Sequence, residues 1–286
     1  MNIKSKVMTA HQKASLGNKN VLMYIDRYYL KPNSFESLLI LSQIMQAEAI
    51  KTAVEAHRRN MPYCMGTLYW QLNDCWPGAS WSSIDYNKNW KVLHYLAKHF
   101  FKAIFVTAYK NKKDIEVFVV NDTQEEKRCD LLIELHDFDG GNRILFNKNL
   151  KITPLASKRY FFHDIRELIS DKDKSKLMLR LYVKEGNKIL SSNNYFFSRP
   201  KELKLPNPDF RVKHKNLGDH ISLKISAKTF LYKVCLTSKN QKGQFSDNYF
   251  DMVKGEVKNI SFYIEDFDND KKEFNFSLRT MCDLTK

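Results

Sequence analysis

Side chains able to hold a sugar gather in one short segment of the chain, residues 66–90. All four tryptophans of the sequence fall within it: Trp70, Trp76, Trp81 and Trp90. Asn73 and Asp74 stand between the first two. An indole face packs against the C–H face of a sugar ring, while amide and carboxylate groups orient hydroxyls through hydrogen bonds. The segment therefore predicts a carbohydrate ligand, with four candidate contacts: Trp70, Asn73, Asp74 and Trp76.

Packing is the alternative role for each tryptophan. In an α/β barrel, residues at the carboxyl end of a strand and in the loop after it face the active site. We expect Trp70 and Asp74, at such a strand end, to bind ligand, and Trp81 and Trp90, near the next helix, to pack. His11 lies in a loop-like stretch with no paired Ser or Cys and no metal-ligand spacing, so we expect it to position other groups.

A long amphipathic helix precedes this segment. Asn33 and Glu36 read as a capping box at its start, and Pro62 forbids its continuation beyond about Asn60. Its apolar residues recur at helical spacing: Leu38, Leu41, Met45, Ala49, Ala53 and Ala56. Glu48 and Glu55 are expected on its solvent-facing side.

The chain then alternates between strand and helix. Residues 63–70 are apolar on both faces, which is typical of a strand in a buried parallel sheet. Another helix is expected from Trp90 to Phe101, with one apolar face made of Leu93, Leu96, Ala97 and Phe100. Helix, strand, loop and helix in this order indicate α/β architecture for the first hundred residues.

From about Ile104 the pattern changes to short strands between turn signals, which indicates all-β sandwiches. Prolines at positions 200, 206 and 208 mark a linker, and we expect one immunoglobulin-like sandwich over 104–199 and a second over 200–286. The expected strands are 115–120, 131–135, 177–183, 221–225, 231–236, 257–264 and 274–278.

Composition limits the classes of partner. The chain carries 47 Lys and Arg against 32 Asp and Glu, a net charge of +15, but the excess is spread along its length, and the longest basic runs are doublets such as Arg58-Arg59. We therefore expect no nucleic-acid partner; association with polyanions is a minor alternative. No apolar run is long enough for a membrane span, and we expect no membrane partner and no secretory signal in this chain.

The five cysteines are widely spaced, odd in number and contain no C-x-x-C pair. Neither a zinc site nor a disulfide framework is predicted, and the thiols are expected to be free.

Residues 66–77, 80–86 and 91–95 closely resemble the last strand and helix of the catalytic barrel in β-mannosidases of glycoside hydrolase family 2. Residues 7–13, with the sequence Val-Met-Thr-Ala-His-Gln-Lys, are similar to the stretch that follows the catalytic nucleophile in that family. Downstream, residues 194–197, 200–206 and 245–251 resemble the two C-terminal β-sandwich domains. The resemblance covers nearly the whole chain.

The resemblance implies a multidomain fold: the C-terminal part of a (β/α)₈ barrel of the TIM type over residues 1–103, followed by the two immunoglobulin-like sandwiches. It implies retaining hydrolysis of terminal β-D-mannosides by the parent enzyme, with no metal or organic cofactor. It also implies that Trp70, Asn73 and Asp74 line the substrate pocket, with Trp76 beside them. The partner would be a mannose-containing oligosaccharide or glycoside.

A retaining glycosidase needs two carboxylates about 5 Å apart. In the resembled family both are glutamates, and both would align upstream of Met1, so no residue here is assigned a catalytic role. We expect this chain alone to be inactive. Its incomplete barrel is expected to self-associate or to be less ordered than the sandwiches. The competing hypothesis is a non-enzymatic carbohydrate-binding or interaction module in which the sandwiches do the work.

Overall fold

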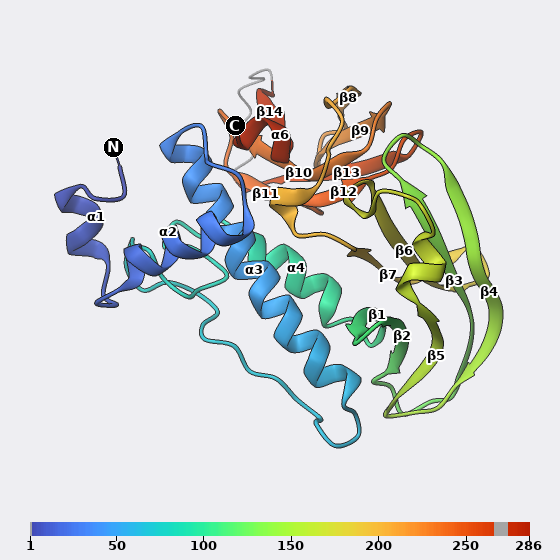
Figure 1. Cartoon of the computed structure of the whole chain (residues 1–286). Coiled ribbons are helices and arrows are strands. Elements are labelled where there is room, and N and C mark those ends of the chain that lie inside the picture. The colour runs from blue at the N-terminus through green and yellow to red at the C-terminus, as the bar shows by residue number, and fades with distance from the viewer. Residues whose placement is uncertain (1, 266–273) are drawn as a thin grey trace.

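The computed structural model describes residues 2–265 and 274–286. A helical segment occupies one end of the molecule, and two antiparallel β-sandwiches lie side by side at the other (Figure 1). The protein is therefore mostly β-sheet, with the small helical portion as the part that corresponds to the expected barrel fragment.

Four helices make up the N-terminal portion: α1 (Lys6–His11), α2 (Gly17–Tyr28), α3 (Phe35–Arg59) and α4 (Val92–Phe100). The expected long helix is confirmed, and it ends at Arg59 with basic residues in its last turn, where they suit the helix dipole. Its cap is Ser34 rather than Asn33, because the Ser34 hydroxyl accepts from the amide of Ser37. The placement of His11 in a loop is wrong, since it closes α1.

The buried face of α3 differs from the expected one in its second half. Leu38 and Leu41 are buried as expected, but Ala49 and Ala53 are exposed. The residues that face the core there are Ala47, Val54, Glu55 and Arg58. Glu55 is only 6% exposed, so its expected place on the surface is also wrong. The core that α3 meets is made by α4 and the sandwiches, which contact a different side of the helix from the alanine stripe.

The expected strand at residues 63–70 does not form. These residues follow Pro62 as turn and extended coil, and Figure 1 shows them as a long trace away from any sheet. Tyr63 is 97% and Leu68 is 101% exposed. A strand needs neighbouring strands for its backbone hydrogen bonds. Residues 2–103 supply none, since they contain helices, turns and isolated bridges and no strand.

α4 is confirmed, with Leu93, Leu96, Ala97 and Phe100 all buried. It packs along α3, and Arg58 of α3 donates to the backbone oxygen of Phe100 at 2.6 Å.

The first sandwich has two sheets in the orders β1-β2-β5 and β4-β3-β6-β7. All strand pairs are antiparallel. Their bounds are β1 (Ile104–Asn111), β2 (Asp114–Asn121), β3 (Lys127–Asp137), β4 (Asn142–Ile152), β5 (Ala156–Asp164), β6 (Leu177–Glu185) and β7 (Lys188–Phe196). Two short helices, α5 (Ile165–Ile169) and the 3-10 turn η1 (Lys174–Lys176), connect β5 to β6. Alternate residues of both sheets meet in one core, as an immunoglobulin-like sandwich requires.

The second sandwich has the sheets β11-β13-β9-β8 and β12-β10-β14. It follows the 3-10 turn η2 (Pro200–Glu202). Its bounds are β8 (Phe210–Asn216), β9 (Ile221–Ala227), β10 (Leu231–Ser238), β11 (Gly243–Phe245), β12 (Phe250–Met252), β13 (Val257–Ile264) and β14 (Phe276–Arg279), and α6 (Met281–Leu284) ends the chain. The strand expected over 274–278 begins at Phe276; the other expected strands lie in β2, β3, β6, β9, β10 and β13.

A partly buried ion pair joins the helical segment to the second sandwich. Lys233 of β10 binds Glu48 of α3 at 2.7 Å and lies 3.9 Å from Asp251. Burial disfavours the charge of Glu48, but Lys233 and Lys51 outweigh it and hold the pKa of that carboxyl below its usual range. Glu48, expected to face solvent, is therefore part of an interdomain contact.

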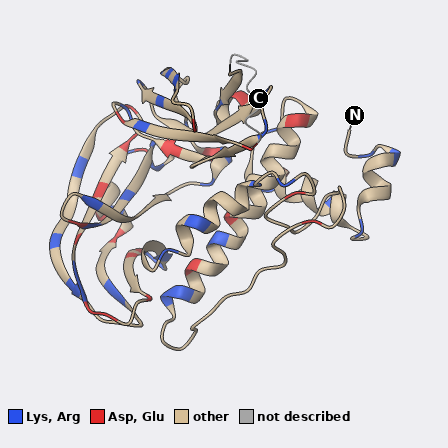
Figure 2. Ribbon diagram, turned by 180° about the vertical axis from the view of Figure 1, so that it is seen from behind, with Lys and Arg blue, Asp and Glu red and all other residues tan. Residues whose placement is uncertain are grey.

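Charged residues of both signs are scattered over the helices and both sandwiches (Figure 2). In the part of the chain that the structure describes, no helix is long and apolar enough to cross a membrane. The cysteines are free thiols, and the described residues include no group of three or more His, Cys, Asp or Glu side chains placed to hold a metal ion.

Candidate functional site

The tryptophan-rich segment folds into a loop whose two arms are hydrogen-bonded to each other. The amides of Ser83 and Ile84 donate to backbone oxygens of Gln71 and Leu72 at 3.0 and 2.8 Å, and the amide of Asp74 donates to the oxygen of Ile84 at 3.0 Å. These hydrogen bonds hold the two arms of the loop together, although the loop belongs to no sheet. The Trp70–Gln71 peptide is cis.

Trp70 and Asn73 lie on the outside of this loop. The Trp70 side chain is 73% exposed, and Asn73 is exposed as well. The Asn73 amide donates to the neighbouring backbone oxygen of Asp74 at 3.3 Å. An exposed indole on a fixed backbone is a surface against which an apolar ligand face can pack.

Asp74 is turned inward. It is 8% exposed, and its carboxylate accepts hydrogen bonds from the Ser80 hydroxyl and, at 2.9 Å, from Nζ of Lys91. Lys91 also donates to Ser82 at 2.6 Å. Burial raises the pKa of Asp74, but the hydrogen bonds from Ser80, Ser82 and Lys91 outweigh it and leave the pKa below its usual range. This buried pair joins the loop to α4, because Lys91 is the residue that caps that helix.

Trp76 is covered on one face by the N-terminal helix. The His11 ring stacks on it with centroids 4.5 Å apart and planes 2° apart, and the Lys13 ammonium lies 4.5 Å from the indole centroid. The His11 Nδ1 also meets the backbone oxygen of Pro77 at 2.5 Å. A Cβ on Gly78 would come within 2.9 Å of the His11 backbone oxygen, so glycine permits this close approach. His11 thus positions Trp76, in keeping with the role expected of it.

The other two tryptophans differ from each other. Trp90 packs edge-on against His94 and Tyr95, as expected. Trp81 is exposed, so its expected packing role is wrong in this structure. Its backbone oxygen accepts from Nε2 of Gln46 at 2.7 Å, which anchors the loop to α3.

The residues whose side chains hold the inner side of the loop were not predicted from the sequence. Lys91, Ser80 and Ser82 surround the Asp74 carboxylate, and the Ser83 hydroxyl contacts both the Tyr69 hydroxyl at 3.0 Å and the His94 ring at 3.1 Å. Burial lowers the pKa of His94. Lys91 falls in the resembled stretch 91–95, but no spacing rule points from Asp74 to a lysine 17 positions later.

The arrangement can bind but offers little acid–base chemistry. Residues 66–91 contain two carboxylates, Asp74 and Asp85. Asp74 is held by Lys91, and Asp85 accepts from the amide and side chain of Asn89. No hydrogen bond among the described residues joins either one to a second carboxyl group. The loop therefore presents the exposed Trp70 indole with no free carboxylate pair beside it among the described residues.

The fold defines the class: a chain with two immunoglobulin-like domains of the kind found in mannosidases. Residues 113–202 match the family described as Mannosidase Ig/CBM-like domain, and residues 205–284 match the Ig-fold domain of mannosidases. The chain is homologous to the C-terminal region of β-mannosidases of glycoside hydrolase family 2.

Individual relatives agree. The β-mannosidase of Bos taurus is 27% identical over 267 residues, which cover 86% of this chain and 30% of the relative. β-Mannosidase A of Emericella nidulans is 24% identical over 285 residues, which cover 91% of this chain and 30% of the relative. The chain spans about a third of the length of the curated relatives it matches.

Two solved structures have a similar fold. The β-D-mannosidase of Dictyoglomus thermophilum superposes with a TM-score of 0.84 at 27% identity, covering 97% of this chain and 34% of that one. The exo-chitosanase CsxA of Amycolatopsis orientalis shares the fold, with a TM-score of 0.75 at 14% identity. The match covers 99% of this chain and 39% of that one.

Proposed function

We propose that this chain supplies part of the substrate pocket of a β-mannosidase that hydrolyses terminal β-D-mannosides with retention. In this proposal residues 1–103 belong to the catalytic barrel, and residues 104–199 and 200–286 are the two immunoglobulin-like domains. The homology to β-mannosidases supports the reaction class, and the alternation of helical and β segments supports the division.

One observation carries the proposal: the exposed Trp70 indole stands on a loop whose backbone is fixed from both sides. Hydrogen bonds between the two arms, the Gln46 contact to Trp81 and the Asp74–Lys91 pair all hold it. Pre-positioning of a binding group lowers the cost of ordering it when the ligand arrives. We propose that Trp70 packs against the mannose ring, with Asn73 and Trp76 beside it.

Asp74 keeps a place in the proposed pocket, with a modified role. Both of its carboxylate oxygens are engaged, one by Ser80 and one by Lys91. We therefore propose that it acts on the sugar mainly by holding Trp70 and Asn73 in position.

The two catalytic carboxylates of the proposed reaction would come from the remainder of the barrel. The 286 residues alone should therefore release no nitrophenol from 4-nitrophenyl β-D-mannoside. Release by the purified chain that survives Asp74→Asn would contradict this and would place the catalytic groups elsewhere in these residues.

The exposed apolar residues of the loop are the proposed docking surface for the rest of the barrel. Tyr63, Met65, Leu68 and Leu72 are all more than half exposed. Exposed large apolar side chains that lie close together in the sequence are candidates for an interaction site. When no barrel partner is present, we expect the same surface to drive self-association.

A further inference from the structure

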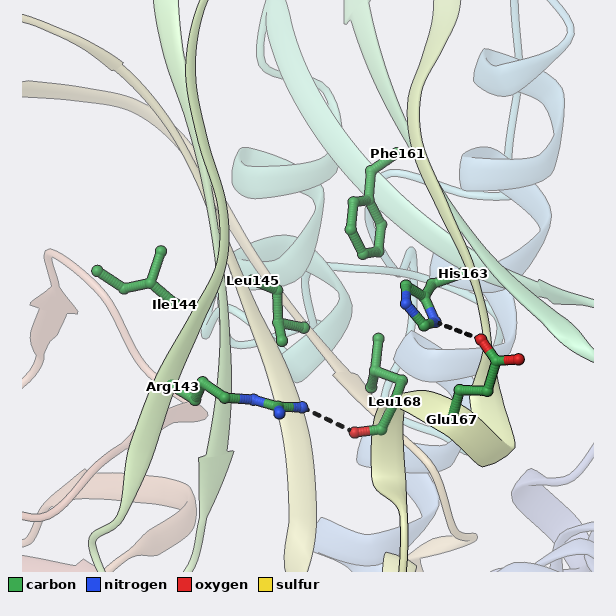
Figure 3. A pocket seen from close by; sticks show the side chains of 7 residues that line it. All are labelled: Arg143, Ile144, Leu145, Phe161, His163, Glu167 and Leu168. Atoms are coloured by element: carbon green, nitrogen blue, oxygen red, sulfur yellow. Dashed lines mark hydrogen bonds and ion pairs between the residues drawn. The ribbon is translucent and has the colours of Figure 1, made fainter.

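A hollow lies on the first sandwich, outside residues 1–103. Its volume is about 250 Å³. Figure 3 shows the side chains that line it: Arg143, Ile144, Leu145, Phe161, His163, Glu167 and Leu168. They come from β4, β5 and α5.

The topology explains why these residues meet. β4 is the edge of one sheet and β5 is the edge of the other, so the two edges face each other where the sandwich is open. α5 begins directly after β5, because the Asp164 carboxylate accepts from the amide of Arg166 at 2.8 Å. Leu168 is buried in the sandwich core, which holds this short helix across the opening.

Two polar side chains of the hollow, Arg143 and His163, contact backbone oxygens of the protein. Nη2 of Arg143 donates to the backbone oxygen of Leu168 at 3.0 Å, which aims the guanidinium along the wall, as Figure 3 shows. Nδ1 of His163 contacts the backbone oxygen of Asp164 at 3.1 Å and lies 3.9 Å from the Glu167 carboxylate. The Glu167 side chain is 75% exposed and free to accept further hydrogen bonds.

The apolar wall faces these groups. Phe161 is half-buried, and its ring lies at a steep angle to Phe146, with centroids 5.8 Å apart. Leu145 and Leu168 complete the wall. The hollow thus combines an aromatic surface with donors from Arg143 and an acceptor from Glu167.

This combination fits a neutral polyhydroxyl better than other ligands. A simple anion would meet the Glu167 carboxylate, and a purely apolar ligand would make no use of the Arg143 donors and the Glu167 acceptor oxygens. A pyranose both donates and accepts hydrogen bonds and has an apolar C–H face for an aromatic ring. The volume is below the range of about 300–1,000 Å³ of sites for drug-sized ligands, which favours a single sugar unit.

We propose that this hollow binds one pyranose of a neutral, mannose-containing glycan, independently of the Trp70 loop. The choice of mannose rests on the proposed function, whereas the choice of a neutral sugar rests on the hollow itself. Such a site on a domain beside the catalytic barrel would hold a glycan near the enzyme.

Saturation-transfer NMR on the full chain with methyl β-D-mannopyranoside tests the proposal. We expect a dissociation constant on the order of 1 mM, since a monosaccharide offers few atoms for contact. Arg143→Ala and Glu167→Gln should each weaken binding about tenfold, because each removes a charge-assisted hydrogen bond. Arg166→Ala is the matched control: it removes an exposed arginine from the same short helix and should leave binding unchanged.

Trp70→Ala separates this site from the proposed pocket wall. Binding that survives Trp70→Ala and is lost in Arg143→Ala supports the proposal, whatever the outcome of the hydrolysis experiments. Binding that is lost in Trp70→Ala and unchanged in Arg143→Ala, or no binding to a chain with unaltered circular dichroism, would each overturn it.

Discussion

Nζ of Lys91 donates to the carboxylate of Asp74 at 2.9 Å inside the loop that carries the exposed Trp70. The side chains of both residues are almost fully buried. A group that the sequence marks as a sugar ligand is thereby part of the internal support of the loop. The proposed pocket wall depends on this pair.

Removing one partner of the pair should loosen the loop more than removing both. Lys91→Met leaves a buried carboxylate without its cation and should destabilise this segment by about 2 kcal/mol, whereas Asp74→Asn combined with Lys91→Met should recover part of the loss. All four tryptophans lie in residues 70–90, so the urea midpoint followed by tryptophan fluorescence reports on this segment. Equal midpoints for the single variant and the parent chain would show that the pair contributes nothing.

The stability of the same segment should fall on acidification, in two ranges. Burial lowers the pKa of His94 from its ordinary 6.5. Below about pH 6.5 the unfolded chain therefore binds a proton that the folded chain does not bind, and the free energy of unfolding decreases as the pH falls. The lowered pKa of Asp74 adds a second loss, which begins near the ordinary 3.8 and proceeds as the pH falls through the folded value.

The fluorescence-detected urea midpoint, measured from about pH 8 to about pH 5, checks the first range. His94→Gln should flatten the curve there. A parent curve that is flat over this range would contradict the role given to His94.

The interdomain pair of Lys233 and Glu48 should matter far more than a surface pair. Lys233→Met leaves Glu48 and Asp251 without their shared cation and should destabilise the chain by about 3 kcal/mol. Lys228→Met removes an exposed partner of Asp209 and should cost less than about 0.5 kcal/mol. Urea unfolding followed by far-ultraviolet circular dichroism compares the two; similar midpoints for both variants would refute the interdomain role.

The exposed apolar surface should control self-association. Tyr63→Ser with Leu68→Ser removes two fully exposed apolar side chains and should weaken association about tenfold or more without lowering the unfolding midpoint. Val257→Ser, a similar change on the second sandwich, should leave association unaltered. Sedimentation velocity over a range of concentrations measures this, and a chain that is monomeric throughout would contradict the proposal.

The spacing of apolar residues correctly predicted those helices and strands that pack against partners present in the chain. The face of α4 and the strands β2, β3 and β6 follow from spacing, since their apolar residues bury against partners present in the chain. The strand at 63–70 could not be predicted correctly from its apolar residues, because a strand forms only where neighbours complete its hydrogen bonds.

The candidate site, too, could be predicted only in part from the sequence. Trp70 was recognisable by its residue type and by the resembled stretch, and its exposure agrees with a binding role. The inward turn of Asp74 depends on Lys91, Ser80 and Ser82, which reach it only after the loop has closed. The burial of Glu55 likewise depends on Thr107 and Asn193, which donate to it from the first sandwich at 2.7 and 2.9 Å.

The most direct test joins this chain to the N-terminal two thirds of the Dictyoglomus thermophilum β-D-mannosidase, in place of that enzyme's matching region, and measures kcat/KM on 4-nitrophenyl β-D-mannoside. The account predicts an active chimera in which Trp70→Ala lowers kcat/KM about a hundredfold, against a small effect of Trp81→Ala, because only Trp70 is assigned to the sugar. An active chimera whose kcat/KM is unchanged by Trp70→Ala would contradict the assignment of this loop to the substrate pocket.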